Sequence, residues 1–157
     1  MPELANKLEF LQSPQAYGDP GLQVISLETH MSWVFLVSEQ VFKLKKPVRF
    51  PFLDFSTLAA REHFCREELR LNARLAPGVY RGLMALQWRD GVFSLVPESE
   101  LQAGLTPLGE TVEWLVCMRR LPANRMLDHL MTQKQVSTED VDAITQLLSD
   151  FYSDAPA

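Results

Sequence analysis

Apolar positions recur along the chain with two different periods, which separate expected helices from expected strands. The spacing of Leu4, Leu8 and Leu11 predicts a short helix that ends before Pro14. A run without glycine or proline, beginning at the candidate N-cap Ser56 and reaching residue 76, predicts one long helix. Short runs rich in β-branched and aromatic residues predict strands at 22–28, 33–37, 41–45, 79–88, 92–96 and 112–118, and residues 98–110 are expected to form a polar loop.

The last part of the chain predicts two further helices. The first covers residues 125–134, and the second begins at Ser137-x-x-Asp140, which is similar to a capping box. Apolar residues then follow at helical spacing: Val141, Ile144, Leu147, Leu148 and Phe151. Short connections such as Asp90-Gly91 favour hairpins, so the predicted sheet is antiparallel. The expected fold class is therefore α+β, with five to six strands and one long helix, rather than a doubly wound fold.

Composition narrows the possible functions. The chain has 157 residues, is 46% hydrophobic and carries a net charge of −5. Residues 126–157 hold six acids and one lysine and so account for the whole −5. A protein without a basic face is not expected to bind nucleic acid broadly. Cys65 and Cys117 form no Cys-x-x-Cys pair, which argues against a metal site or a disulfide framework. The absence of a long apolar run predicts no membrane partner and a cytoplasmic location.

The most distinctive local feature is a strand with two lysines. Alternation places Lys43 and Lys45 on one face of the predicted strand, with Phe42 and Leu44 on the other. If Phe42 and Leu44 pack under the long helix, the two ammonium groups stand on the opposite face of the sheet. A lysine fixed by a strand can hold a phosphate group as a point charge. The alternative is the charged outer face of an ordinary hairpin.

A second feature is a carboxylate within the apolar arc of the long helix. On a helical wheel Glu68 falls between Phe64 and Leu71. A buried carboxylate needs a partner, and Lys43 or Lys45 on the preceding strand is the natural candidate. The alternatives are that Glu68 lies at the helix edge, or that the helix is shifted by one residue.

These features together resemble a known family. The predicted elements follow one another in a set order: strands, a strand with lysines, a helix with a glutamate, and then further strands. This order resembles the N-terminal lobe of the protein-kinase-like superfamily, in particular its aminoglycoside phosphotransferase branch. Three segments look like an uncharacterised bacterial group of phosphotransferase-like proteins sometimes fused to a P-loop ATPase, and the match covers about residues 20–125. The segments that carry it are 28–36 (ETHMSWVFL), 41–48 (VFKLKKPV) and 52–58 (FLDFSTL), running on to 64–72 (FCREELRLN).

The resemblance implies roles for several residues around an ATP site with Mg²⁺. The turn at residues 29–32 would cover phosphates, with Ser32 and its backbone able to touch them. Lys43 would hold the α- and β-phosphates, with Lys45 as the alternative on the same face. The glutamate that pairs with the lysine would be Glu67 or Glu68, and Glu68 fits the apolar side of the helix better.

The same resemblance implies a hinge at Cys117-Met118-Arg119. The backbone of this hinge would meet adenine, and the Met118 side chain would form an apolar wall. The implied domains are an N-terminal helix and loop (1–20), a kinase-like N-lobe (21–122) and the helical start of a truncated C-lobe (123–157).

The sequence also departs from the family pattern. Kinase-like transfer needs a catalytic aspartate on a His-x-Asp loop and a later aspartate for Mg²⁺, and none of His30, His63 and His129 has that context. The resemblance thus implies the nucleotide-binding half of a phosphotransferase, binding ATP weakly and inactive alone, with no catalytic or metal-binding residue assigned. The alternative is a non-catalytic interaction module, with self-association or a protein partner through the C-terminal helices.

Overall fold

The structure, a computed structural model, describes residues 2–104 and 109–154. It divides into two compact units, one reaching to Arg120 and the other starting at Leu121.

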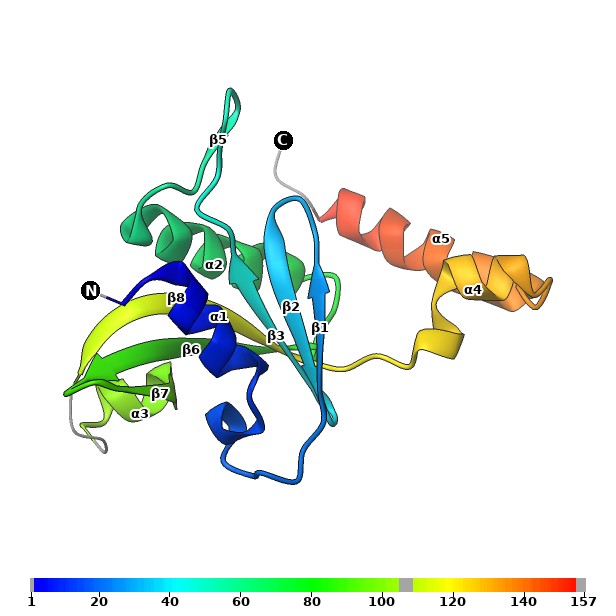
Figure 1. Cartoon of the computed structure of the whole chain (residues 1–157). Coiled ribbons are helices and arrows are strands. Elements are labelled where there is room, and N and C mark those ends of the chain that lie inside the picture. Colours follow the sequence, from blue (N-terminus) through cyan, green and yellow to red (C-terminus); the bar gives the residue numbers. More distant parts are fainter. Residues whose placement is uncertain (1, 105–108, 155–157) are drawn as a thin grey trace. The chain divides into compact units, whose positions relative to one another are not determined.

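The first unit is built on one six-stranded antiparallel sheet (Figure 1). Its spatial order is β1-β2-β3-β8-β6-β7, so the last strand in sequence lies in the middle of the sheet. The strands are β1 (Val24–Glu28), β2 (Ser32–Val37), β3 (Gln40–Lys45), β6 (Tyr80–Arg89), β7 (Val92–Pro97) and β8 (Glu110–Arg119). The predicted α+β class and antiparallel sheet are confirmed.

Tight turns fix the register of the two hairpins. Asp90 and Gly91 both have positive φ, 49° and 86°, the backbone that a two-residue hairpin loop requires. Ser38, in the turn between β2 and β3, also has a positive φ of 50°. Because both connections are short, β6 pairs with β7 and β2 pairs with β3 along their lengths.

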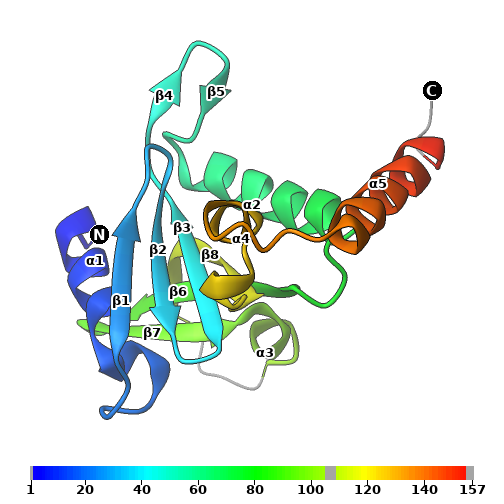
Figure 2. The same ribbon diagram turned by 90° about the vertical axis from the view of Figure 1, so that its right-hand side faces the viewer.

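Each face of the sheet has its own apolar core and its own helix. One core includes Leu11 of α1 (Leu4–Gln12) together with Phe42 and Leu44 of β3. The other includes Cys65 of α2 (Leu58–Asn72) together with Val116 of β8. Figure 2 shows α1 and α2 on opposite sides of the sheet. A short 3-10 helix, η1 (Pro14–Tyr17), continues from α1, and its Tyr17 packs against the first core.

The long helix is present, but its buried face differs from the expected one. Its N-cap is Thr57, whose side chain accepts a hydrogen bond from the Ala60 N–H, and not Ser56. The buried residues are Arg61 and Cys65, whereas Leu71, expected on the apolar arc, is 43% exposed. The prediction centred the arc on the large apolar side chains. The helix instead packs through a face that includes an arginine.

Several elements, including two short strands and a helix, were not predicted. The strands β4 (Arg49–Phe50) and β5 (Leu53–Asp54) form a small separate hairpin between β3 and α2. A helix, α3 (Glu98–Gln102), lies in the segment expected to be a polar loop, of which residues 105–108 fall outside the described residues. Its Leu101 packs against the core beneath α2.

The second unit consists of η2 (Ala123–Arg125), α4 (Leu127–Thr132) and α5 (Thr138–Ser153). The predicted capping box is confirmed, because Ser137 Oγ accepts from the Asp140 N–H while the Asp140 carboxylate accepts from the Ser137 N–H. Across residues 2–104 and 109–154, every helix is too short or too polar to cross a bilayer.

Candidate functional site

The two lysines of β3 converge on one carboxylate of α2. The Lys43 Nζ lies 2.9 Å from Oε1 of Glu68, and the Lys45 Nζ lies 2.6 Å from Oε2. Each ammonium therefore occupies its own carboxylate oxygen. The ion pair expected between the lysine strand and the long helix is present, and both lysines take part in it.

The face on which the lysines lie corrects one expectation. Phe42 and Leu44 do not pack under the long helix, because both belong to the core that includes Leu11 of α1. The lysine face is the one that α2 covers. Lys43 is opposite Val116, which packs with Cys65 of α2 in the other core. Strand alternation defines two faces, but it does not say which of them a given helix will cover.

The two lysines differ in their surroundings. The Lys45 side chain is 7% exposed, and its ammonium lies 5.1 Å from the centroid of the Phe55 ring, a cation–π distance. The Lys43 side chain is 31% exposed. Two ammonium groups and one carboxylate leave a charge of +1, and the more accessible lysine is the one that can share it with an incoming anion.

The charge state of Glu68 follows from these contacts. Burial acts to raise the pKa of Glu68, but hydrogen bonds from Lys45 and Lys43 and the positive charge of both lysines outweigh burial and hold that pKa below its usual 4.5. Glu68 is therefore ionised at neutral pH. The other candidate, Glu67, instead bonds to Arg70 of the same helix at 2.8 Å, away from the two lysines.

Ser32 lies at the start of β2, opposite Lys45 in the strand register. It is 2% exposed, and its backbone N–H donates to Thr29 Oγ1 at 3.0 Å. Its carbonyl accepts from the Thr29 N–H at 2.8 Å. The turn at residues 29–32 is thus closed by its own hydrogen bonds, so contact between this backbone and a phosphate would require the turn to open.

Cys117 and Met118 point to opposite faces of the sheet. Cys117 is buried in the core beneath α1, whereas Met118 packs against the core beneath α2, on the same face as Lys43. Both residues lie within β8, which pairs with β3 and with β6 at these positions. Their backbones take part in strand pairing within the sheet. The Met118 side chain lies on the face where an anion bound by Lys43 would lie.

A second ionic cluster was missed at the level of sequence. Glu113 of β8 is 2% exposed and accepts from Arg61 of α2 with both oxygens, at 2.9 Å (Nε–Oε2) and 2.7 Å (Nη2–Oε1). The Lys7 ammonium of α1 lies 3.0 Å from the same carboxylate. The one available signal was a glutamate inside the apolar run 112–118, because a charge in such a run requires a buried partner.

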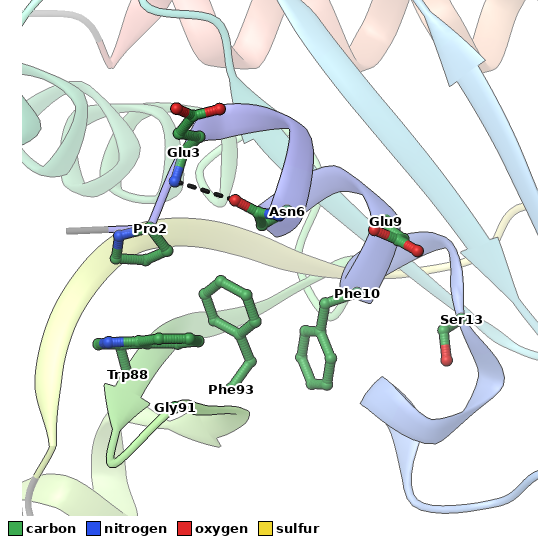
Figure 3. Close-up of a pocket in the computed structure, with 9 residues that line it drawn as sticks. All are labelled: Pro2, Glu3, Asn6, Glu9, Phe10, Ser13, Trp88, Gly91 and Phe93. Atoms are coloured by element: carbon green, nitrogen blue, oxygen red, sulfur yellow. Dashed lines mark hydrogen bonds between the residues drawn. The ribbon is translucent and has the colours of Figure 1, made fainter.

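A shallow groove of about 720 Å³ lies on the other side of the sheet from Glu68, between α1 and the β6–β7 turn (Figure 3). Its base is aromatic. The Phe10 ring is stacked on Phe93 with centroids 5.3 Å apart, and the Trp88 ring is tilted against Phe93 at 4.5 Å. These rings also pack against the core that contains Leu11. The groove is therefore a feature of the α1 face and is separate from the lysine site.

Comparison with known proteins gives a small set of relatives. No family model matches the chain, and no solved structure matches it. The chain is 33% identical over 128 residues to an uncharacterized protein of Mycobacterium tuberculosis strain H37Rv, and equally to one of Mycobacterium bovis. The alignments cover 82% of this chain but 22% of each relative. The chain thus spans about a fifth of the length of these relatives, whose names carry no activity.

Proposed function

We propose that the first unit is the nucleotide-binding half of a kinase-like phosphotransferase. The observation that carries this proposal is the contact of Lys43 and Lys45 with Glu68. In protein kinases a lysine on the third strand pairs with a glutamate of the following helix, and this pair places the lysine for the phosphates of ATP. Here β3 carries the lysines and α2, the next long helix, carries the glutamate.

Within this proposal the lysines have separate tasks. Lys43 binds phosphate, because its side chain is the more exposed and can move toward an anion without uncovering the core. Lys45 keeps Glu68 and Phe55 in place, because it is enclosed by both. Met118 lies on the same face of the sheet and supplies apolar surface for a base.

The chain supplies binding rather than transfer. The phosphates of ATP fit a site with a charge of +1, but phosphoryl transfer also needs a base or positioning residue and a held Mg²⁺. None of His30, His63 and His129 is followed by the aspartate of a His-x-Asp loop. We therefore expect these 157 residues to bind nucleotide weakly and to transfer no phosphate alone.

Calorimetric titration with ATP and with inorganic tripolyphosphate tests the proposal. We expect both to bind, and Lys43→Gln to weaken binding at least tenfold. Arg89→Gln is the matched control, because it removes one charge from an exposed residue at the end of β6. Tripolyphosphate binding without any preference for ATP would reduce the proposal to a phosphate site. Binding of neither ligand at millimolar concentration, or equal weakening by both variants, would refute it.

A protein-interaction role is the second candidate, and the second unit favours it. Its helices expose apolar side chains along a groove lined by Leu127, Met131, Lys134, Val136, Val141 and Ile144. Exposed apolar surface of this kind marks interaction sites. Sedimentation analysis that compares the wild type with Val141→Glu tests this role, because a charge in the groove should disrupt any self-association. A wild type that stays monomeric would remove self-association as the form of this role.

A further inference from the structure

Three charged side chains meet in the interior of the first unit, where charges are costly. Arg61 and Glu113 are 6% and 2% exposed, and Lys7 reaches the same carboxylate from α1. The cluster also bonds to the backbone. Arg61 Nη1 donates to the carbonyls of Phe55 and Ser56, and the Lys7 ammonium donates to the Val112 carbonyl at 2.9 Å. The Glu113 carboxylate thus joins β8 to α1 and α2, and the Arg61 guanidinium also holds the segment that leads into α2.

Stability alone is a poor reason for such a cluster. Buried ion pairs replaced by apolar side chains of similar volume often leave a protein equally stable or more stable, because desolvation offsets the attraction. A bidentate guanidinium–carboxylate pair is, by contrast, strongly directional. An apolar contact tolerates rotation and sliding of a helix, whereas this pair tolerates neither.

The position of the pair makes this directionality relevant to Glu68. Arg61, Cys65 and Glu68 are spaced i, i+4 and i+7 on α2, so they lie along one side of the helix, about two turns from end to end. Glu113 lies on β8, the strand that carries Met118 and pairs with the lysine strand β3. The hydrogen bonds that Arg61 donates to Glu113 therefore fix the helix that bears Glu68 relative to the strands that bear Lys43 and Met118.

We propose that Arg61, Glu113 and Lys7 are positioning residues that set the rotation and axial placement of α2, and through it the contact of Glu68 with Lys43 and Lys45. Their effect on nucleotide affinity rests on the proposed function, but their effect on Glu68 does not. The N-terminal helix α1 is then part of the device, because its Lys7 completes the cluster from the other side of the sheet.

The test replaces the cluster by apolar side chains of similar size, Lys7→Met with Arg61→Met and Glu113→Leu. Three quantities are measured: the melting temperature, the pKa of the Glu68 carboxyl by NMR, and the affinity for tripolyphosphate. We expect the melting temperature to stay within a few degrees of wild type, the Glu68 pKa to rise toward its usual value, and affinity to fall at least tenfold. The control, Glu67→Gln with Arg70→Gln, neutralises an exposed ion pair on the same helix and should leave affinity and melting temperature unchanged.

Each outcome either supports or overturns the positioning role. A folded triple variant with an unchanged Glu68 pKa would overturn the positioning role. A triple variant that fails to fold would show that the cluster serves stability and would also overturn it. Arg61→Lys keeps the charge but loses the bidentate contact with Glu113. If the positioning role is right, this variant must raise the Glu68 pKa while the protein stays folded. If the Glu68 pKa responds but the wild type binds neither ATP nor tripolyphosphate, the positioning role stands and the proposed function fails.

Discussion

Lys45 is held between Glu68 and Phe55, with its ammonium 2.6 Å from a Glu68 carboxylate oxygen and 5.1 Å from the centroid of the Phe55 ring. Lys43, two residues earlier on the same strand, shares the carboxylate but has about a third of its side chain in solvent. The two lysines thus have different surroundings: Lys45 is buried and Lys43 is partly exposed to solvent.

We expect the two lysines to differ in their contribution to stability. Lys45→Met removes a buried charge-assisted hydrogen bond and a cation–π contact, which should cost about 1.5–3 kcal/mol in the free energy of unfolding. Lys43→Met removes a more exposed pair that solvent screens, and should cost no more than about 1 kcal/mol. Urea unfolding of both variants measures the difference. Equal losses would contradict the separate tasks assigned to the two residues.

Acid should reduce the contribution of Glu68. Because the folded-state pKa of Glu68 is below its usual 4.5, the carboxylate stabilises the fold above pH 4.5, and that stabilisation is lost as the pH falls through the lower, folded-state pKa. Glu68→Gln leaves a buried ammonium without its carboxylate and should cost on the order of 3 kcal/mol at pH 7. The difference between wild type and variant should shrink progressively below pH 4.5.

The subtraction isolates Glu68 from other carboxylates. Asp54, Glu67 and Asp140 also have lowered pKa values, through hydrogen bonds from Ser56, Arg70 and Ser137 respectively. These groups are present in both proteins, so their contributions cancel in the difference. A wild-type advantage that stays constant from pH 7 to pH 3 would show that the Glu68 charge does not stabilise the fold.

Local sequence patterns predicted most of the main elements, although not the β4–β5 hairpin or α3, and they did not predict how the elements pack. The six strands of the main sheet, the long helix, the Asp90-Gly91 turn and the Ser137 capping box depend on residues close together in the chain, and each was predicted. The contact of β3 with Glu68 was predicted too, because an unpaired carboxylate on an apolar arc demands a nearby cation.

What the patterns could not show depends on distant partners. Arg61 is buried because Glu113, 52 residues further along, satisfies its guanidinium. On a helical wheel Arg61 counts as polar and Leu71 as apolar, so the expected buried face includes Leu71 and leaves out Arg61, the reverse of what the structure shows. The alternation of β3 likewise assigns its residues to two faces without showing which face the long helix covers. Only the placement of α1 and α2 decided that the lysines lie beneath the helix.

Cys65 offers a direct measure of how firmly α2 is seated. Its side chain is fully buried on the helix face between Arg61 and Glu68, and burial raises the pKa of its thiol to about 11. At pH 8 about one thiol in a thousand would be ionised, and thiolate is the reactive form. In a Cys117→Ala background, we expect alkylation of Cys65 in the folded protein to be at least a hundredfold slower than in urea. Arg61→Lys should speed the folded-state reaction by loosening α2, whereas Arg89→Gln should not. Fast labelling of folded wild-type protein would mean that α2 leaves the sheet readily, and a helix so loosely seated could not keep Glu68 beside Lys43 and Lys45.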